Sequence, residues 1–227
     1  MNLFRVLSFL SMVGLASLAP GGSQVAHAAG LDVVVTDSNG DLVINAVVTL
    51  TNSEKSSSEL IVSDIQTSAS GLLMSMNQRD KAFIPNVLPV HVGTRVTFPN
   101  QDDTQHHVFS FSRPKQFEMR LNAGSIGEGI LFDVPGIVTV GCNIHDNMVG
   151  HIYVSSTPLF AASDEQGLAQ FSDLAPGTYT LKLWHQRMNG REDNFSQTVT
   201  ILADVDRRAD AQIRLKPQRS DRRRRRY

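Results

Sequence analysis

The strongest constraint on the fold of this chain is a short loop that carries three soft metal ligands between two apolar runs. The run GIVTVG leads directly into Cys142, His145 and Met148, and a second run, HIYVSS, follows. Both runs have the length and the β-branched composition of strands. A loop between two neighbouring strands can direct a thiolate, an imidazole and a thioether at one point. We therefore expect a metal site at the end of a pair of strands.

The rest of the sequence also reads as strands. Short apolar or alternating segments recur throughout and are separated by Gly, Pro, Asn, Asp and Ser, as in VTFPN, HHVFSFS, FEMRLN and GILFDV. This pattern is typical of an all-β sandwich. We find no convincing amphipathic helix after the first 28 residues.

A second imidazole is available upstream of the loop. The segment VTFPN ends at Asn100, and after five more residues a strand-like run begins with His106 and His107. Successive side chains of a strand face opposite ways, so only one of these two histidines can easily point at a metal. One imidazole from this pair would complete a set of two nitrogens, one thiolate and one thioether, which is the ligand set of a blue copper site.

Zinc is the main competitor, because it binds thiolate and imidazole equally well. The thioether of Met148 favours copper, since methionine is a soft ligand. The sequence shows no nucleophile triad, phosphate-binding glycine loop or metalloprotease motif. We therefore expect no catalytic residues and no enzyme activity.

Residues 74–156 resemble the cupredoxin family of blue copper proteins. The loop CNIHDNM, residues 142–148, has the short spacing of the amicyanin-like members, and VTFPN followed by five residues and His106 is similar to the family's pattern. The resemblance covers a little over a third of the chain. It implies a cupredoxin Greek-key β-sandwich with one type 1 copper ion. The implied ligands are His106, Cys142, His145 and Met148.

The same resemblance bears on the two adjacent histidines. In the family, the ligand histidine is usually followed by Asn and then Val, and here His107 stands in the Asn position before Val108. We therefore assign His106 as the ligand and expect His107 to face solvent or to support the site from outside. His91 and His151 lack the ligand spacing and are interpreted as structural. We assign no chemistry to His185.

The segments on either side resemble a carboxypeptidase-regulatory-like (transthyretin-like) sandwich. LDVVVTDSNGDLVINAVVTL reads as two strands joined by a turn, and ASDEQGLAQFSDLAPGTYTLKLWH is similar to the continuation of that family. We expect residues 30–66 and 158–215 to pair into a second small β-sandwich, into which the cupredoxin is inserted. Alternatively, these segments add strands to the cupredoxin's own sheets.

The first 28 residues read as a secretory signal peptide. One arginine precedes the apolar run VLSFLSMVGLASLA, and Ala26-His27-Ala28 supplies a cleavage signal. We therefore expect export to the periplasm. The only cysteine is Cys142, so no internal disulfide can form, and in an oxidising compartment a metal would protect its thiolate.

Charge is distributed unevenly along the chain. Of the 21 Lys and Arg and the 22 Asp and Glu, ten basic and two acidic residues lie from Arg207 onward, so the preceding body is acidic. The end of the chain, residues 216–227, includes the run Arg222 to Arg226, and we expect a disordered basic tail. Such a tail either remains solvated or contacts an acidic partner or a membrane surface. Nucleic acid is not an expected partner.

The cupredoxin resemblance implies single-electron transfer by a monomer, with a cytochrome or an amine-oxidising enzyme as redox partner. Proteins of the methylamine-utilisation type are similar in this respect. The alternative is a copper carrier or chaperone, or a binding module without a redox role.

Overall fold

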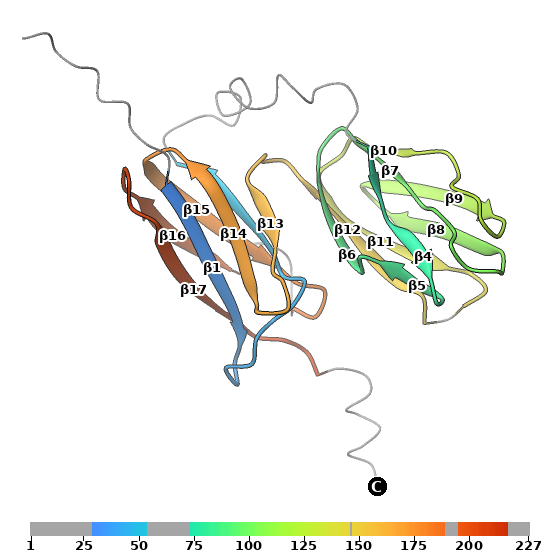
Figure 1. The fold of residues 1–227 in the computed structure, drawn as a ribbon, viewed down its shortest axis with the longest axis horizontal. Coiled ribbons are helices and arrows are strands. Elements are labelled where there is room, and N and C mark those ends of the chain that lie inside the picture. Colours follow the sequence, from blue (N-terminus) through green and yellow to red (C-terminus); the bar gives the residue numbers. More distant parts are fainter. Residues whose placement is uncertain (1–28, 54–72, 146, 189–194, 218–227) are drawn as a thin grey trace, which may run out of the picture.

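The computed structural model describes residues 29–53, 73–145, 147–188 and 195–217. These residues form strands joined by turns and loops, so the predicted all-β class is confirmed. No helix capable of crossing a membrane occurs within these ranges. The predicted signal peptide, residues 54–66 of the first flanking segment and residues 218–227 of the tail lie outside the described residues (Figure 1).

The middle of the chain forms a β-sandwich. Its larger sheet has the strand order β6-β12-β11-β8-β9. These strands are β6 (Val87–His91), β12 (Val149–Ser155), β11 (Gly136–Cys142), β8 (His106–Ser112) and β9 (Lys115–Leu121). The second layer contains β10 (Ile130–Phe132), β7 (Thr94–Thr97) and β3 (Leu73–Ser75), with the hairpin of β4 (Asn77–Arg79) and β5 (Ala82–Ile84) beside them.

Strand alternation decides what this sandwich buries. Along β8, His106, Val108 and Ser110 face the interior, whereas Phe109 and Phe111 face outward. The interior is otherwise apolar and close-packed, and both layers contribute to it. A buried histidine at the first position of β8 therefore stands out.

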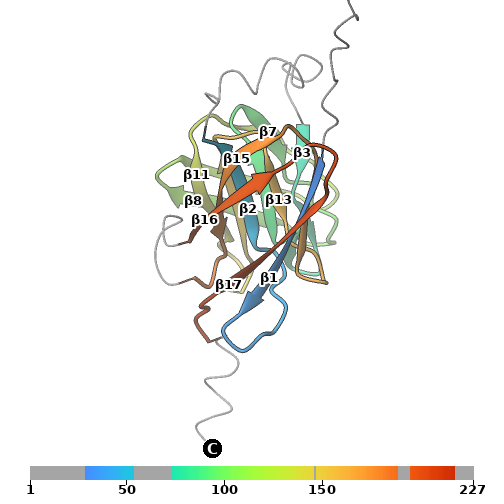
Figure 2. The ribbon, with the colours of Figure 1, turned by 90° about the vertical axis from the view of Figure 1, so that its left-hand side faces the viewer.

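The flanking segments form a second sandwich of their own. One sheet has the order β14-β1-β17 and the other β13-β2-β15-β16 (Figure 2). These strands are β1 (Ala29–Asp37), β2 (Val47–Asn52), β13 (Phe160–Ala162), β14 (Leu168–Leu174), β15 (Gly177–Trp184), β16 (Ser196–Ile201) and β17 (Arg207–Ile213).

Strands from before and after the middle unit interleave in this second sandwich. Strand β2 pairs with β13 and β15, while β1 pairs antiparallel with β14 and parallel with β17. The interior includes the fully buried Leu31, Leu50 and Leu181. The flanking strands thus share a core with one another and add nothing to the sheets of the middle unit.

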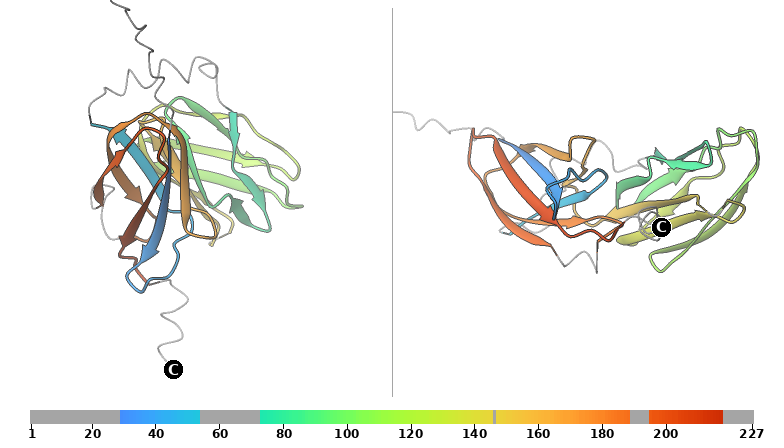
Figure 3. Two further views of the ribbon diagram at one scale, coloured as in Figure 1. Left: turned by 60° about the vertical axis from the view of Figure 1, so that its left-hand side comes forward. Right: turned by 90° about the horizontal axis from the view of Figure 1, so that it is seen from below.

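A small apolar cluster joins the two sandwiches, which lie side by side (Figure 3). Val47 and Trp184 come from the flanking sandwich, and Val87 and Tyr153 come from the middle unit. The rings of Tyr153 and Trp184 have centroids 5.8 Å apart. The outer face of β6 and β12 is therefore covered by the second sandwich.

Candidate metal site

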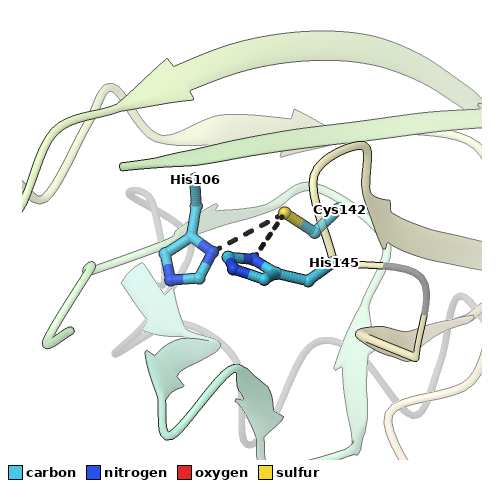
Figure 4. A group of neighbouring side chains, drawn as sticks. All are labelled: His106, Cys142 and His145. Carbon is cyan, nitrogen blue, oxygen red and sulfur yellow. Dashed lines mark hydrogen bonds between the residues drawn. The ribbon is translucent and has the colours of Figure 1, made fainter. Parts of the chain in front are cut away.

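The topology of the middle unit places the predicted ligands at one end of the larger sheet. Cys142 is the last residue of β11 and His106 is the first of β8. The two strands are antiparallel neighbours in which Cys142 pairs with Val108, so their ligand-bearing ends meet. His145 enters from the loop that joins β11 to β12, and its ring lies beside that of His106 (Figure 4).

Three donor atoms converge at this end of the sheet. The Sγ atom of Cys142 lies 3.6 Å from Nδ1 of His106 and 3.6 Å from Nδ1 of His145. All three donors lie within 4.8 Å of one another. One ion bound at about 2.3 Å to sulfur and about 2.0 Å to nitrogen would hold such atoms roughly 3.5 to 3.7 Å apart. The residues present therefore fit a single transition-metal ion.

The fourth predicted ligand, Met148, is buried in the same apolar cluster as Cys142. The Cys142 N–H donates to the Met148 carbonyl at 3.1 Å, and the Met148 N–H donates to the His145 carbonyl at 2.9 Å. These two hydrogen bonds close the loop and hold the Met148 backbone next to the Cys142 backbone. With two imidazoles, a thiol and a methionine in the same loop, the residue types suit copper better than zinc.

A carboxylate fixes the orientation of the His106 ring. Nε2 of His106 lies 2.8 Å from Oδ2 of Asp102. Donation of the Nε2 proton to this carboxylate leaves the Nδ1 lone pair free to face Cys142. A carboxylate behind a ligand histidine is a recurrent way of setting both tautomer and ring orientation in metal sites.

Asp102 is itself held by a tight turn between β4 and β5. Asp80 and Lys81 both adopt positive φ, of 55° and 56°, which non-glycine residues seldom do. Their N–H groups donate to the Asp102 carboxylate at 2.6 and 3.0 Å. The turn therefore anchors the carboxylate that orients His106.

The same contacts decide the charge state of Asp102. Burial works to raise the pKa of its carboxyl group, but the hydrogen bonds from Lys81, His106 and Asp80 outweigh burial. The net effect holds the pKa of Asp102 below its ordinary value. The carboxylate form that accepts the His106 proton is thus the favoured one.

His107 points away from the donor atoms, as the assignment of His106 requires. Its Nε2 lies 2.6 Å from Oε1 of Glu118, and its Nδ1 lies 3.5 Å from Nδ2 of Asn143. The Asn143 N–H also donates to the His107 carbonyl at 3.0 Å. His107 therefore ties the residue after Cys142 to β8 from outside the site.

Three other histidines lie away from the donor group. His151 contacts Oγ1 of Thr139 at 3.2 Å and the ring of Trp184 at a centroid distance of 5.7 Å, and burial lowers its pKa. His185 is buried in the flanking sandwich. His91 ends β6. His91 and His151 thus lie outside the donor group, and their interpretation as structural residues stays a prediction.

Two supporting residues, Asp102 and Glu118, were not found by sequence reasoning. Asp102 stands four residues before His106 in an acidic loop, and that spacing was a weak signal for a contact. Glu118 lies on β9, and its contact with His107 depends on the pairing of β8 with β9. This pairing places Glu118 opposite Phe109 and therefore diagonally across from His107, two residues earlier in β8.

Comparison with known proteins finds no matching family model and no matching curated protein. Solved structures that match include the Cu-containing nitrite reductase (NirK) from Thermus scotoductus SA-01, at 29% identity and a TM-score of 0.35, covering 37% of this chain and 22% of that one. A purple cupredoxin from Nitrosopumilus maritimus matches at 25% identity and a TM-score of 0.32, covering 37% and 99%. A reduced amicyanin mutant matches at 18% identity and a TM-score of 0.30, covering 47% and 99%. The structural neighbours are thus cupredoxins, and this chain spans about a fifth of the nitrite reductase.

Proposed function

We propose that this chain is an exported type 1 copper protein that carries single electrons between redox partners in the periplasm. One observation carries the proposal. A buried thiol, that of Cys142, lies at 3.6 Å from the Nδ1 atoms of both His106 and His145. Methionine follows in the same loop, and the chain is proposed to be an electron carrier without enzyme activity.

Each residue has a distinct part in this function. Cys142 would provide the thiolate, and Asp102 holds His106 so that its Nδ1 atom would be available to a bound ion. Met148 is proposed as the fourth ligand. Bound copper supplies one-electron chemistry by changing between Cu(II) and Cu(I). Because these ligands are positioned by strand ends and loop hydrogen bonds, little of the protein has to rearrange between the two states.

His145 connects the site to the surface. Its side chain is only partly buried, and the preceding residue, Ile144, is exposed at 54%. An exposed apolar side chain next to a ligand histidine suits brief contact with a redox protein. A cytochrome or an amine-oxidising enzyme is the proposed partner, in keeping with a methylamine-utilisation type of protein. The chain is proposed to act as a monomer, and its basic tail to contact an acidic partner or membrane surface.

Titration of the purified, metal-free protein with Cu(II) tests this function. We expect an intense blue thiolate-to-copper absorption that disappears on reduction and returns on oxidation. Cys142→Ser should abolish it. His106→Gln should abolish or strongly shift it, whereas the matched variant His107→Gln should retain it, because only His106 faces the sulfur.

Two results would contradict the proposal. A colourless complex that binds Cu(I) and exchanges it rapidly would identify a copper carrier. Loss of the band in His107→Gln with retention in His106→Gln would show that the ligand assignment is wrong.

A further inference from the structure

The outer face of β8 carries a pair of aromatic rings, of which Phe111 is exposed and Phe109 is partly buried. Phe111 is 77% exposed, more than any other large apolar side chain in the described ranges. Its ring centroid lies 5.0 Å from that of Phe109, the preceding outward residue of the strand. Apolar groups gathered at the surface of a folded protein commonly mark a contact site.

This aromatic pair touches the backbone next to the sulfur ligand. Phe109 pairs with Gly141, the residue before Cys142. A Cβ atom placed on Gly141 would lie only 3.1 Å from Cζ of Phe109, so the ring rests directly on the glycine backbone. A short path therefore leads from the Cys142 sulfur through Gly141 to Phe109 and then to Phe111 at the surface.

The charges around the aromatic pair are uneven. Arg113 lies in the turn after β8, and Arg120 lies on β9 opposite His107; both are exposed, and neither forms an ion pair within the described part of the chain. Of the nearby acids, Asp133 is paired with Lys115 at 3.3 Å. Glu118 lies opposite Phe109, contacts His107 at 2.6 Å and is 62% exposed. The two arginines therefore outnumber the one carboxylate that has no cationic lysine or arginine partner beside the aromatic pair.

The neighbouring part of the same sheet face already packs against protein. Ile137 on β11 contacts the cluster that joins the two sandwiches, which includes Tyr153 and Trp184. Strands β8 and β9 lie on the side of the sheet away from the flanking sandwich (Figure 1). Phe109 and Phe111 lie on the same outward face of this sheet as Ile137, and Phe111 is exposed there.

We propose that Phe109 and Phe111, with Arg113 and Arg120, form a contact surface for a redox protein whose contact face carries carboxylates. The inference rests on the proposed electron-transfer function and adds a second surface to the His145 edge. One electron passes between the partner and the copper ion by way of the rings and Gly141. The partner is oxidised by one electron as Cu(II) becomes Cu(I), or reduced in the reverse direction, and no proton or bond is exchanged.

Two forms of one probe protein test the surface: native cytochrome c, which is basic, and succinylated cytochrome c, which carries carboxylates in place of lysine ammonium groups. Stopped-flow absorbance would follow electron transfer from each reduced probe to the copper-loaded protein. Arg113→Ala with Arg120→Ala, and separately Phe111→Ala, should slow the succinylated probe roughly tenfold, and neither change should slow the native probe. The matched control Leu202→Ala, which removes an exposed apolar side chain of the flanking sandwich, should not slow the succinylated probe.

A second measurement separates docking from copper chemistry. In an NMR titration of the metal-free and the Cu(I) protein with succinylated cytochrome c, the amides of residues 107–120 should shift. Shifts confined to residues 143–145 and 147–149, or equal rates for wild type and the surface variants, would overturn this inference while leaving a blue, reversible copper band intact. Absence of the band would instead refute the proposed function, and the titration of the metal-free protein would still decide the surface.

Discussion

Both sandwiches bury a histidine, and the surroundings of the two histidines differ. His106 in the middle unit has no exposed surface and is backed by the Asp102 carboxylate, with the Cys142 thiol on its other side. His185 in the flanking sandwich is 5% exposed and lies near Arg187, whose charge opposes protonation. The first environment is arranged to hold a cation, and the second excludes one. Burial of a histidine alone is therefore no sign of a metal site.

The largest expected change is a loss of unfolding free energy caused by a substitution in the core of the flanking sandwich. This substitution should leave the copper site unchanged. Leu181→Ala removes a fully buried side chain, which costs about 2 to 5 kcal/mol of unfolding free energy. Urea unfolding followed by circular dichroism would measure this loss, while the copper absorption of the folded protein should not change. Thr198→Ala, at an exposed position of β16, is the control. A shifted copper band in Leu181→Ala would show that the two regions are not independent.

Acid should weaken the flanking sandwich through His185. Burial first, and then the charge of Arg187, lower the pKa of His185 to about 4 from an ordinary value of 6.5, against a hydrogen bond with Ile44 that raises it. Between pH 4 and pH 6.5, the imidazole of His185 is therefore protonated in the unfolded chain and neutral in the folded chain. The unfolding free energy should therefore fall as the pH drops from 6.5 toward 4, by up to about 1 kcal/mol per pH unit.

Urea unfolding at pH 7 and pH 5 measures this dependence. His185→Gln should show a smaller drop than the wild type, and the remaining drop should include His151, whose pKa is also lowered. Equal drops in wild type and variant would contradict the assigned role of His185.

In the middle unit, the corresponding test concerns the carboxylate behind His106. Asp102→Asn removes the negative charge and disturbs the hydrogen bonds from Asp80 and Lys81, so copper affinity should fall about 10- to 100-fold. Competition with a copper chelator would measure the affinity. The exposed neighbour variant Asp103→Asn is the matched control and should bind copper as tightly as the wild type. Equal affinities for both variants would leave Asp102 without a role at the site.

The smallest effect is expected outside the donor group. Glu118 contacts His107 at 2.6 Å, but its side chain is 62% exposed. Glu118→Gln should change the unfolding free energy by less than about 1 kcal/mol and leave the copper band in place. A larger loss of stability in urea, or loss of the band, would show that the His107 contact does more than tie the loop to β8.

A feature of the molecule could be predicted from the sequence when it depends on residues that are close in the chain or on adjacent strands. Strand alternation and a short loop bring Cys142, His145 and His106 together, because neighbouring residues and adjacent strands suffice. The Asp102 contact could not be read in the same way, because it depends on a left-handed turn at residues 80–81 that reaches the loop from another part of the chain. The exposure of Phe111 likewise depends on which part of the sheet the second sandwich leaves uncovered.

The interleaved pairing of the flanking strands sets an order in which the molecule can assemble. All strands of the middle unit come from one continuous stretch, β3 to β12, so this unit can fold as soon as that stretch is available. Strand β1 must wait for β14 and β17, whose residues follow more than a hundred positions later. Contacts so distant in sequence form slowly. A nascent chain can therefore complete its ligand-bearing half while its first strand is still unpaired.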